Sequence, residues 1–245
     1  MLSPKSVVAR FVPALLLLVV VFFAAGCGTP SPDNGAEPLA TSPAPESTSE
    51  VAGSDPAATR ILFLGDSITA GLGVDQMEAF PARVGTQLTG EGYSISVIDA
   101  GVSGDTSTGG LNRLDWSLQN RVDVLVLELG GNDGLRGIDL DLTRANLGSI
   151  IERTRKTWPD VDVVLVGMQV PPNLGTEYTA TFARMYPKLA REYRTGFVPF
   201  AGEDFGDILH LLQNDGIHPT AEGHAMIADK IVQAIRPLVE QRQAE

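Results

Sequence analysis

A short run near the C-terminus, residues 215–219 (DGIHP), combines an acid and a histidine at a spacing that suits proton transfer. The proline that follows His218 keeps this residue out of helical geometry directly before a helical pattern. Asp215, three residues earlier and across a glycine, can turn back to accept the Nδ1 proton, which leaves Nε2 free to take a proton from a hydroxyl. The chain has only two other histidines, and we expect structural or surface roles for His210 and His224.

Serine is a weak nucleophile until a base accepts its proton, and the attacked carbonyl oxygen needs hydrogen-bond donors as it becomes negative. Three polar loops follow consecutive apolar runs and contain Ser67, Gly104 and Asn132. Ser67 offers its hydroxyl and its backbone N–H, Gly104 an uncrowded backbone N–H, and Asn132 a side-chain amide. Small and polar residues of this kind occur in any tight turn, so each loop alone is weak evidence for a functional site. Together they predict a serine hydrolase with an oxyanion hole.

These motifs resemble the SGNH (GDSL) hydrolases, in particular their bacterial branch of thioesterases, lysophospholipases and arylesterases. The four matching blocks are Gly65–Ser67, Ser103–Ser107, Glu128–Gly137 and Asp215–Pro219. The resemblance implies Ser67 as nucleophile, Gly104 and Asn132 as oxyanion donors beside the Ser67 N–H, and Asp215 with His218 as the rest of a triad. It also implies a flavodoxin-like strand order and an acyl site bordered by residues 134–139. The expected substrates are aryl and alkyl esters, lysophospholipids or thioesters, and no metal or cofactor is needed.

Two other functions stay open beside this esterase. An enzyme with the same fold and triad can remove acetyl groups from envelope polysaccharide, and a preference for acetyl esters would identify it. A catalytically silent lipoprotein that only binds a ligand is disfavoured, because all the residues of the constellation are present. The α/β-hydrolase family is disfavoured too, since Ile68 and Thr69 follow Ser67 where its nucleophile motif requires a glycine two residues on. Asp66 and Glu128 are expected to bind loop amides.

Short apolar runs alternate with helical patterns over residues 60–245. The expected strands are Ile61–Leu64, Ile95–Ile98, Val122–Leu129, Val161–Val166 and, more weakly, Phe197–Phe200. The helical patterns cover Leu111–Leu118, Leu147–Thr154, Phe182–Leu189 and Ile227–Leu238. Strands that are apolar along most of their length predict a parallel sheet with helices on both faces. We therefore expect an α/β fold, a three-layer α/β/α sandwich whose ligands bind beyond the carboxyl ends of the strands.

The charge balance excludes some partners. The chain has 30 acidic and 18 basic residues and a net charge of −12, the wrong sign for binding nucleic acid. Its single cysteine, Cys27, excludes an intrachain disulfide framework.

The N-terminal region predicts export and a lipid anchor. Lys5 and Arg10 precede an apolar run at 11–25, which is shorter than the roughly 20 residues of a membrane-spanning helix. Small residues directly before Cys27 resemble a lipoprotein processing site, so we expect a signal peptide at 1–26 and lipidation of Cys27. Residues 27–59 are rich in Pro, Ser and Thr and predict a disordered tether, with the hydrolase domain at 60–245. We therefore expect the mature protein to be a membrane-anchored lipoprotein of the bacterial cell envelope.

Overall fold

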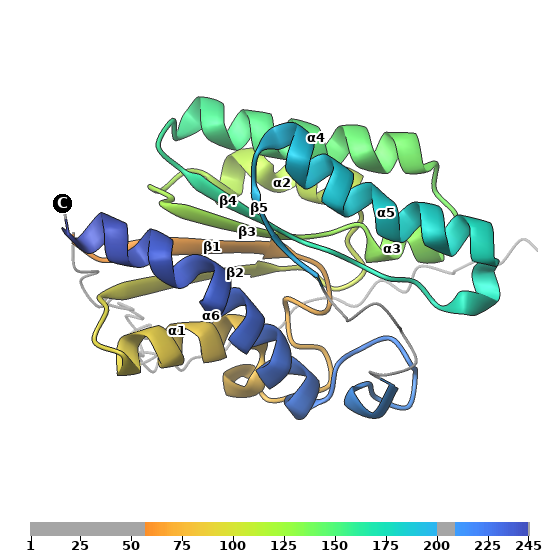
Figure 1. Cartoon of the computed structure of the whole chain (residues 1–245), viewed down its shortest axis with the longest axis horizontal. Helices are drawn as coiled ribbons and strands as arrows, with labels where there is room; N and C mark the ends of the chain where they lie inside the picture. The colour runs from red at the N-terminus through yellow and green to blue at the C-terminus, as the bar shows by residue number, and fades with distance from the viewer. Residues whose placement is uncertain (1–56, 200–208, 245) are drawn as a thin grey trace, which may run out of the picture. The chain divides into compact units, whose positions relative to one another are not determined.

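The computed structural model describes residues 57–199 and 209–244, and a sheet of five parallel strands lies at the centre of that part (Figure 1). The strands are β1 (Thr59–Gly65), β2 (Ile95–Gly101), β3 (Val124–Glu128), β4 (Asp162–Val166) and β5 (Gly196–Val198). Their order is β2-β1-β3-β4-β5, the flavodoxin-like order, and each neighbouring pair is parallel. The expected sheet is therefore confirmed.

The central strands are buried along their length because helices cover both faces of the sheet. The side chains from Ile61 to Leu64 in β1 and from Val124 to Leu127 in β3 are fully buried. Strand β2 lies at the edge of the sheet and is mostly half-buried, and it accordingly mixes serine and aspartate with its apolar residues. Continuous apolar runs are what strands covered on both sides require.

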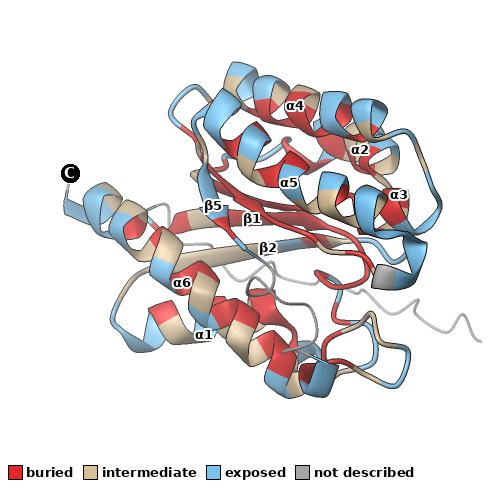
Figure 2. Ribbon diagram, turned by 45° about the vertical axis from the view of Figure 1, so that its right-hand side comes forward, coloured by how far each residue is buried: buried red, intermediate tan, exposed pale blue. Residues whose placement is uncertain are grey.

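Six α-helices flank the sheet in the described part of the chain. They are α1 (Phe80–Gly90), α2 (Ser107–Ser117), α3 (Gly131–Leu135), α4 (Leu140–Thr157), α5 (Thr176–Tyr193) and α6 (Ala221–Ala244). Helices α1 and α6 pack together on one face, and α2, α4 and α5 cover the other (Figures 1 and 2). Figure 2 shows buried residues concentrated on the strands and on the helix faces turned toward them. The three-layer arrangement is thus the predicted one.

Helices α1 and α3 lie outside the helical patterns predicted from the sequence. In α1, Gly85 stands in the middle and weakens the helical pattern, whereas Pro81 lies in the first turn, where proline is tolerated. Gly85 is there for packing, because a Cβ at this position would lie 2.7 Å from Cγ2 of Val97 in β2. Helix α3 has only five residues, too few for a periodic pattern.

The N-terminal predictions concern residues that the structure largely leaves out. The signal peptide at 1–26, Cys27 and most of the tether at 27–59 lie outside the described residues, as does Phe200 at the end of the expected fifth strand. Strand β1 already begins at Thr59, whose side chain is buried. Within the described ranges, no helix is both long and apolar enough to cross a membrane.

Candidate active site

The hydroxyl of Ser67 lies against the imidazole of His218, at the carboxyl end of the central strand β1. Ser67 Oγ is 2.8 Å from Nε2 of His218, and Nδ1 of the same ring is 2.6 Å from Oδ2 of Asp215. A carboxylate only accepts hydrogen bonds, so Nδ1 carries the proton and Nε2 accepts from the serine. The contacts that the sequence predicted for these three side chains are present, and together they form a path for one proton.

The backbone of the 215–219 turn fixes the carboxylate of Asp215. Its Oδ1 accepts the backbone N–H groups of Ile217 (2.9 Å) and His218 (3.0 Å), while Oδ2 faces the ring. Gly216 has φ +67°, a left-handed conformation that glycine adopts without strain. Desolvation opposes ionisation, but the hydrogen bonds from the His218 ring and from these amides lower the pKa of Asp215. The acid is therefore held in its charged form.

Gln213 joins the histidine turn to the serine loop, a contact that the sequence did not predict. Its Nε2 donates to the carbonyl oxygens of Leu72 and Pro219, both at 2.8 Å. Its backbone N–H donates to the carbonyl of His218 at 2.7 Å, and Leu72 in turn donates to the carbonyl of Ser67 at 3.0 Å. One side chain thus sets the distance between the loops that carry Ser67 and His218.

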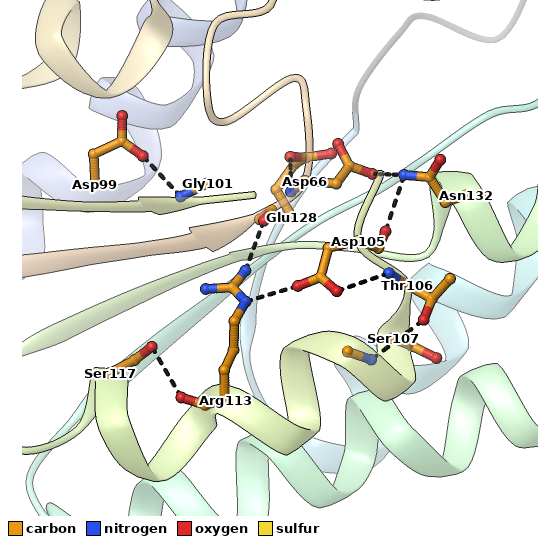
Figure 3. Close-up of polar contacts among 12 residues, drawn as sticks. Asp66, Asp99, Gly101, Asp105, Thr106, Ser107, Arg113, Ser117, Glu128 and Asn132 are labelled. Carbon is orange, nitrogen blue, oxygen red and sulfur yellow. Dashed lines mark hydrogen bonds and ion pairs between the residues drawn. The ribbon is translucent and has the colours of Figure 1, made fainter. Parts of the chain in front are cut away.

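The three expected oxyanion donors follow three adjacent strands. Ser67 follows β1, Gly104 follows β2 with φ +80°, and Asn132 lies in α3, just after β3. Within the described ranges, the backbone N–H groups of Ser67 and Gly104 donate to no protein acceptor. The Asn132 amide instead donates to Oδ2 of Asp66 (3.2 Å) and to the carbonyl of Asp105 (2.9 Å), as Figure 3 shows.

Two buried acids lie directly behind Ser67. Oδ1 of Asp66 accepts the N–H of Ile68 at 3.0 Å, and Oε2 of Glu128 accepts the hydroxyl (2.6 Å) and the N–H (3.2 Å) of Thr69. Both acids therefore bind loop amides as expected, and Asp66 in addition binds Asn132. Burial raises the pKa of Asp66 to about 6 and that of Glu128 well above its usual value, the latter also because Asp66 lies close to it.

An arginine of α2 ties the first two loops together. Arg113 donates through Nε to Oδ2 of Asp105 at 2.7 Å (Figure 3), and through Nη2 to the carbonyl of Gly65 at 2.8 Å. Since the carbonyl of Asp105 accepts from Asn132, this ion pair also supports the third loop. Asp105 belongs to a motif found in the sequence, but its pairing with Arg113 was not predicted.

The buried carboxylate of Asp133 anchors helix α3, which contains Asn132. Asp133 is fully buried and accepts the N–H (2.8 Å) and the hydroxyl (2.5 Å) of Ser107 and the hydroxyl of Thr143 (3.1 Å). These contacts fasten α3 to the first turns of α2 and α4. The position of Asn132 is therefore set by buried polar contacts rather than by its own loop alone.

A cavity of about 260 Å³ opens beside the serine and the histidine. Ser67, Asn132 and His218 line it, but Gly104 is not among the lining residues. Its apolar wall consists of Ile68, Leu135, Met168, Pro171 and Ile217. Leu135 comes from the 134–139 loop expected to border an acyl site. The cavity offers an apolar surface next to the hydroxyl of Ser67, as an acyl group would require.

The remaining histidines lie away from the hydroxyl of Ser67. His224 is fully buried, accepts the N–H of Phe80 on Nδ1 at 3.2 Å and stacks on that ring. Burial, followed by the charges of Arg83 and His218, lowers its pKa to about 4. His210 is exposed. The geometry therefore fits the structural and surface roles expected for these two residues.

The chain resembles known esterases over most of its described length. Residues 63–226, more than half of the chain, match the GDSL-like Lipase/Acylhydrolase family. Esterase TesA of Pseudomonas aeruginosa is 39% identical over 184 residues, which are 75% of this chain and 90% of that protein. Thioesterase 1/protease 1/lysophospholipase L1 of Escherichia coli is 36% identical over 184 residues, 75% of this chain and 86% of that protein. The crystal structure of AlinE4, an SGNH-hydrolase family esterase, superimposes with a TM-score of 0.59 at 38% identity, covering 75% of this chain and 96% of the other.

Proposed function

Because the chain belongs to the GDSL-like lipase/acylhydrolase family, we propose that Ser67 is the nucleophile of a serine esterase that cleaves carboxylic esters through an acyl-enzyme. The protein is a carboxylic ester hydrolase of the TesA and arylesterase type. The observation that carries the assignment of residues is the continuous path from Asp215 through His218 to the hydroxyl of Ser67, beside an apolar cavity.

Acylation begins when His218 Nε2 takes the proton of the Ser67 hydroxyl as Oγ bonds to the ester carbonyl carbon. The carbonyl oxygen becomes an oxyanion, toward which the N–H groups of Ser67 and Gly104 and the amide of Asn132 donate. Asp215 stabilises the charged ring. The C–O bond to the leaving alcohol then breaks, and the alcohol takes the proton from His218.

Deacylation repeats these steps with water. His218 removes a proton from the water as its oxygen attacks the acyl carbon, and the same donors hold the second oxyanion. The bond to Ser67 Oγ breaks, His218 returns the proton to the serine, and the carboxylic acid leaves. The geometry is thereby restored for the next substrate.

The substrates proposed for this site are aryl and alkyl esters, lysophospholipids and thioesters with an acyl chain that fits the apolar cavity. The side chains of Met168 and Leu135 offer the chain an apolar surface, and among the described residues that line the cavity only Asp66 and His218 are ionisable. The related proteins described as esterase, lysophospholipase and thioesterase support this range.

The test is hydrolysis of p-nitrophenyl esters from acetyl to palmitoyl by the purified protein, with Ser67→Ala measured in parallel. We expect a rate that depends on Ser67 and is highest for medium chains. A rate confined to the acetyl ester would favour removal of acetyl groups from polysaccharide. Equal rates for wild type and Ser67→Ala on every ester would refute the nucleophile and favour a binding protein.

For the N-terminal region we propose a lipoprotein that Cys27 anchors in the bacterial cell envelope, after removal of residues 1–26. The support is the apolar run followed by small residues and a single cysteine. Growth of bacteria that produce the full chain with labelled palmitate tests the proposal, with Cys27→Ser as the control. Label in the wild type but not in Cys27→Ser is the expected result, and label in neither would contradict it.

A further inference from the structure

The Asn132 amide differs from the other two oxyanion donors in how its hydrogens are used. It has two N–H hydrogens, and both are engaged, one with Oδ2 of Asp66 at 3.2 Å and one with the carbonyl of Asp105 at 2.9 Å. The N–H groups of Ser67 and Gly104 have no protein acceptor in the part of the chain that the structure describes. An oxyanion therefore has to share a hydrogen with one of the acceptors that hold Asn132.

These two acceptors also decide which end of the amide faces the reacting group. If the amide turned by 180°, its carbonyl oxygen would face a carboxylate and a carbonyl, and neither can donate. Only the observed orientation satisfies Asp66 and Asp105, and it directs the NH₂ group to their side. The carboxylate of Asp66 is itself fixed, because its other oxygen accepts the N–H of Ile68 at 3.0 Å.

We propose that Asp66 is a positioning residue for the oxyanion hole: it holds the Asn132 amide with its NH₂ group toward the ester oxygen, and it yields part of that hydrogen bond when the oxyanion forms. The inference rests on the proposed function, because it requires Asn132 to act as a donor. The bond to Asp66 is the longer of the two and is therefore the one more readily shared.

The pKa of Asp66 depends on its hydrogen bond from Asn132, because Asp66 is buried among other ionisable groups. Asp66 is buried, and the ionisable groups that interact with it are Glu128 at the end of β3, Asp105 after β2, Tyr186 of α5 and His218 before α6. Burial raises the pKa of Asp66 to about 6, whereas the hydrogen bonds from Ile68 and Asn132 and the charge of His218 lower it. Loss of the Asn132 amide should therefore raise the pKa of Asp66 further.

A double-mutant cycle on the full-length protein tests the proposal, with p-nitrophenyl butyrate as substrate. Asn132→Ala is expected to lower kcat about 10²- to 10³-fold, as removal of one oxyanion donor does elsewhere. Asp66→Asn keeps the size of the side chain but replaces the carboxylate by an amide. The amide presents either an NH₂ group or one neutral oxygen to Asn132. We expect it to lower kcat about 10- to 100-fold with KM changed less than about threefold. In the Asn132→Ala background, Asp66→Asn should lower kcat by less than about threefold.

Asp99→Asn is the matched control. Asp99 also stands at the end of a strand and accepts one backbone N–H, from Gly101 at 2.9 Å, but it is exposed and does not contact Asn132 (Figure 3). Its kcat is expected to equal that of the wild type. Thermal unfolding followed by circular dichroism identifies the variants whose fold is intact.

Three results would overturn the proposal. Additive losses in the double variant, an unchanged kcat in Asp66→Asn, or a loss confined to KM would each show that Asp66 does not act through Asn132. An active Asn132→Ala would instead remove the oxyanion role of Asn132, and with it that part of the proposed function. If Asp66→Asn does not fold, the pKa of Asp66 measured by carbon NMR in wild type and Asn132→Ala decides. A higher value in the variant supports the coupling, and an equal value contradicts it.

Discussion

The two halves of the proposed active site are held in place by different kinds of structure. The proton-transfer half depends on one turn, in which Asp215 and His218 stand three residues apart and the Asp215 side chain is 44% exposed. In the oxyanion half, Asn132 contacts Asp66, 66 residues away, and its neighbour Asp133 is fully buried. A substitution in a local, exposed turn can abolish proton transfer while the fold stays intact. In a buried network, by contrast, chemistry and stability change together.

The largest effect is expected in the proton-transfer half, from Asp215→Asn. The amide would donate to Nδ1 of His218 and force the proton onto Nε2, which could no longer accept from Ser67. We expect kcat to fall about 10⁴-fold, with the unfolding temperature close to that of the wild type because the side chain is partly exposed. Steady-state kinetics and thermal unfolding on the same preparation measure both. A large fall in the unfolding temperature would break the comparison.

In the oxyanion half, Asp133→Ala should damage stability as well as activity. It would leave the N–H and the hydroxyl of Ser107 and the hydroxyl of Thr143 without their buried acceptor. The free energy of unfolding is expected to fall by about 3 to 5 kcal/mol, with kcat about tenfold lower because Asn132 is adjacent. Urea unfolding monitored beside esterase activity measures the two losses. Full stability with lost activity would show that the two halves do not differ in this way.

The pH dependence of stability should have opposite signs in the two halves. Burial raises the pKa of Asp66 from 3.8 to about 6, so between these values the folded state binds more protons than the unfolded state. Its contribution to stability therefore falls as pH rises through this window, by about 2 to 3 kcal/mol in total. The pKa of Asp215 is lowered, so its contribution is present above pH 3.8 and is lost as pH falls below that value.

Urea unfolding between pH 3 and 7 of wild type, Asp66→Asn and Asp215→Asn separates these contributions. Relative to Asp66→Asn, the wild type should lose stability as pH rises from 4 to 6. Relative to Asp215→Asn, it should gain stability as pH rises from 3 to 4. If the stability of the wild type relative to each variant changed with pH in the same direction for both variants, the opposite pKa shifts of Asp66 and Asp215 would be contradicted.

The smallest effect is expected from Gly104→Ala. Gly104 has φ +80°, where an alanine is strained by about 1 to 2 kcal/mol, but its Cβ would meet only Arg136, at 3.6 Å. We expect this loss of stability together with a several-fold lower kcat, since the strained loop displaces an oxyanion donor. Gly92→Ala is the matched control, because Gly92 has φ +98° and free space around it at the opposite end of the sheet. Equal kcat values in the two variants would argue against Gly104 as a donor.

The sequence predicted the proton-transfer half better than the oxyanion half, for a physical reason. Asp215 and His218 lie within one short motif, and their contact follows from local turn geometry. The bond from Asn132 to Asp66 and the contacts of Gln213 with Leu72 join residues 66 and 141 positions apart. Such contacts depend on how the strands and loops pack in three dimensions. This packing cannot be read from the local pattern of a single sequence. The roles of Ser67, Gly104 and Asn132 stay predictions that the experiments above test.

The same distinction holds for the fold. The strands were predictable from their continuous apolar runs, and the long helices α4, α5 and α6 from apolar residues that recur at helical spacing. Helix α1 was not, since its internal Gly85 serves the close approach to Val97 rather than a helical pattern. The periodicity of a segment reveals the surface it buries, whereas a glycine that admits a neighbour shows its purpose only in the packed structure.

The base proposed for this enzyme is synthesised long after the proposed nucleophile. Ser67 and His218 are 151 residues apart, and His218 directly precedes α6, which packs on α1. On the proposed mechanism, a nascent chain therefore already carries Ser67 but has no base for it until His218 has been synthesised and lies against the serine hydroxyl. On the same mechanism, esterase activity requires the C-terminal segment to be in place, so we expect the chain to be inactive during its synthesis.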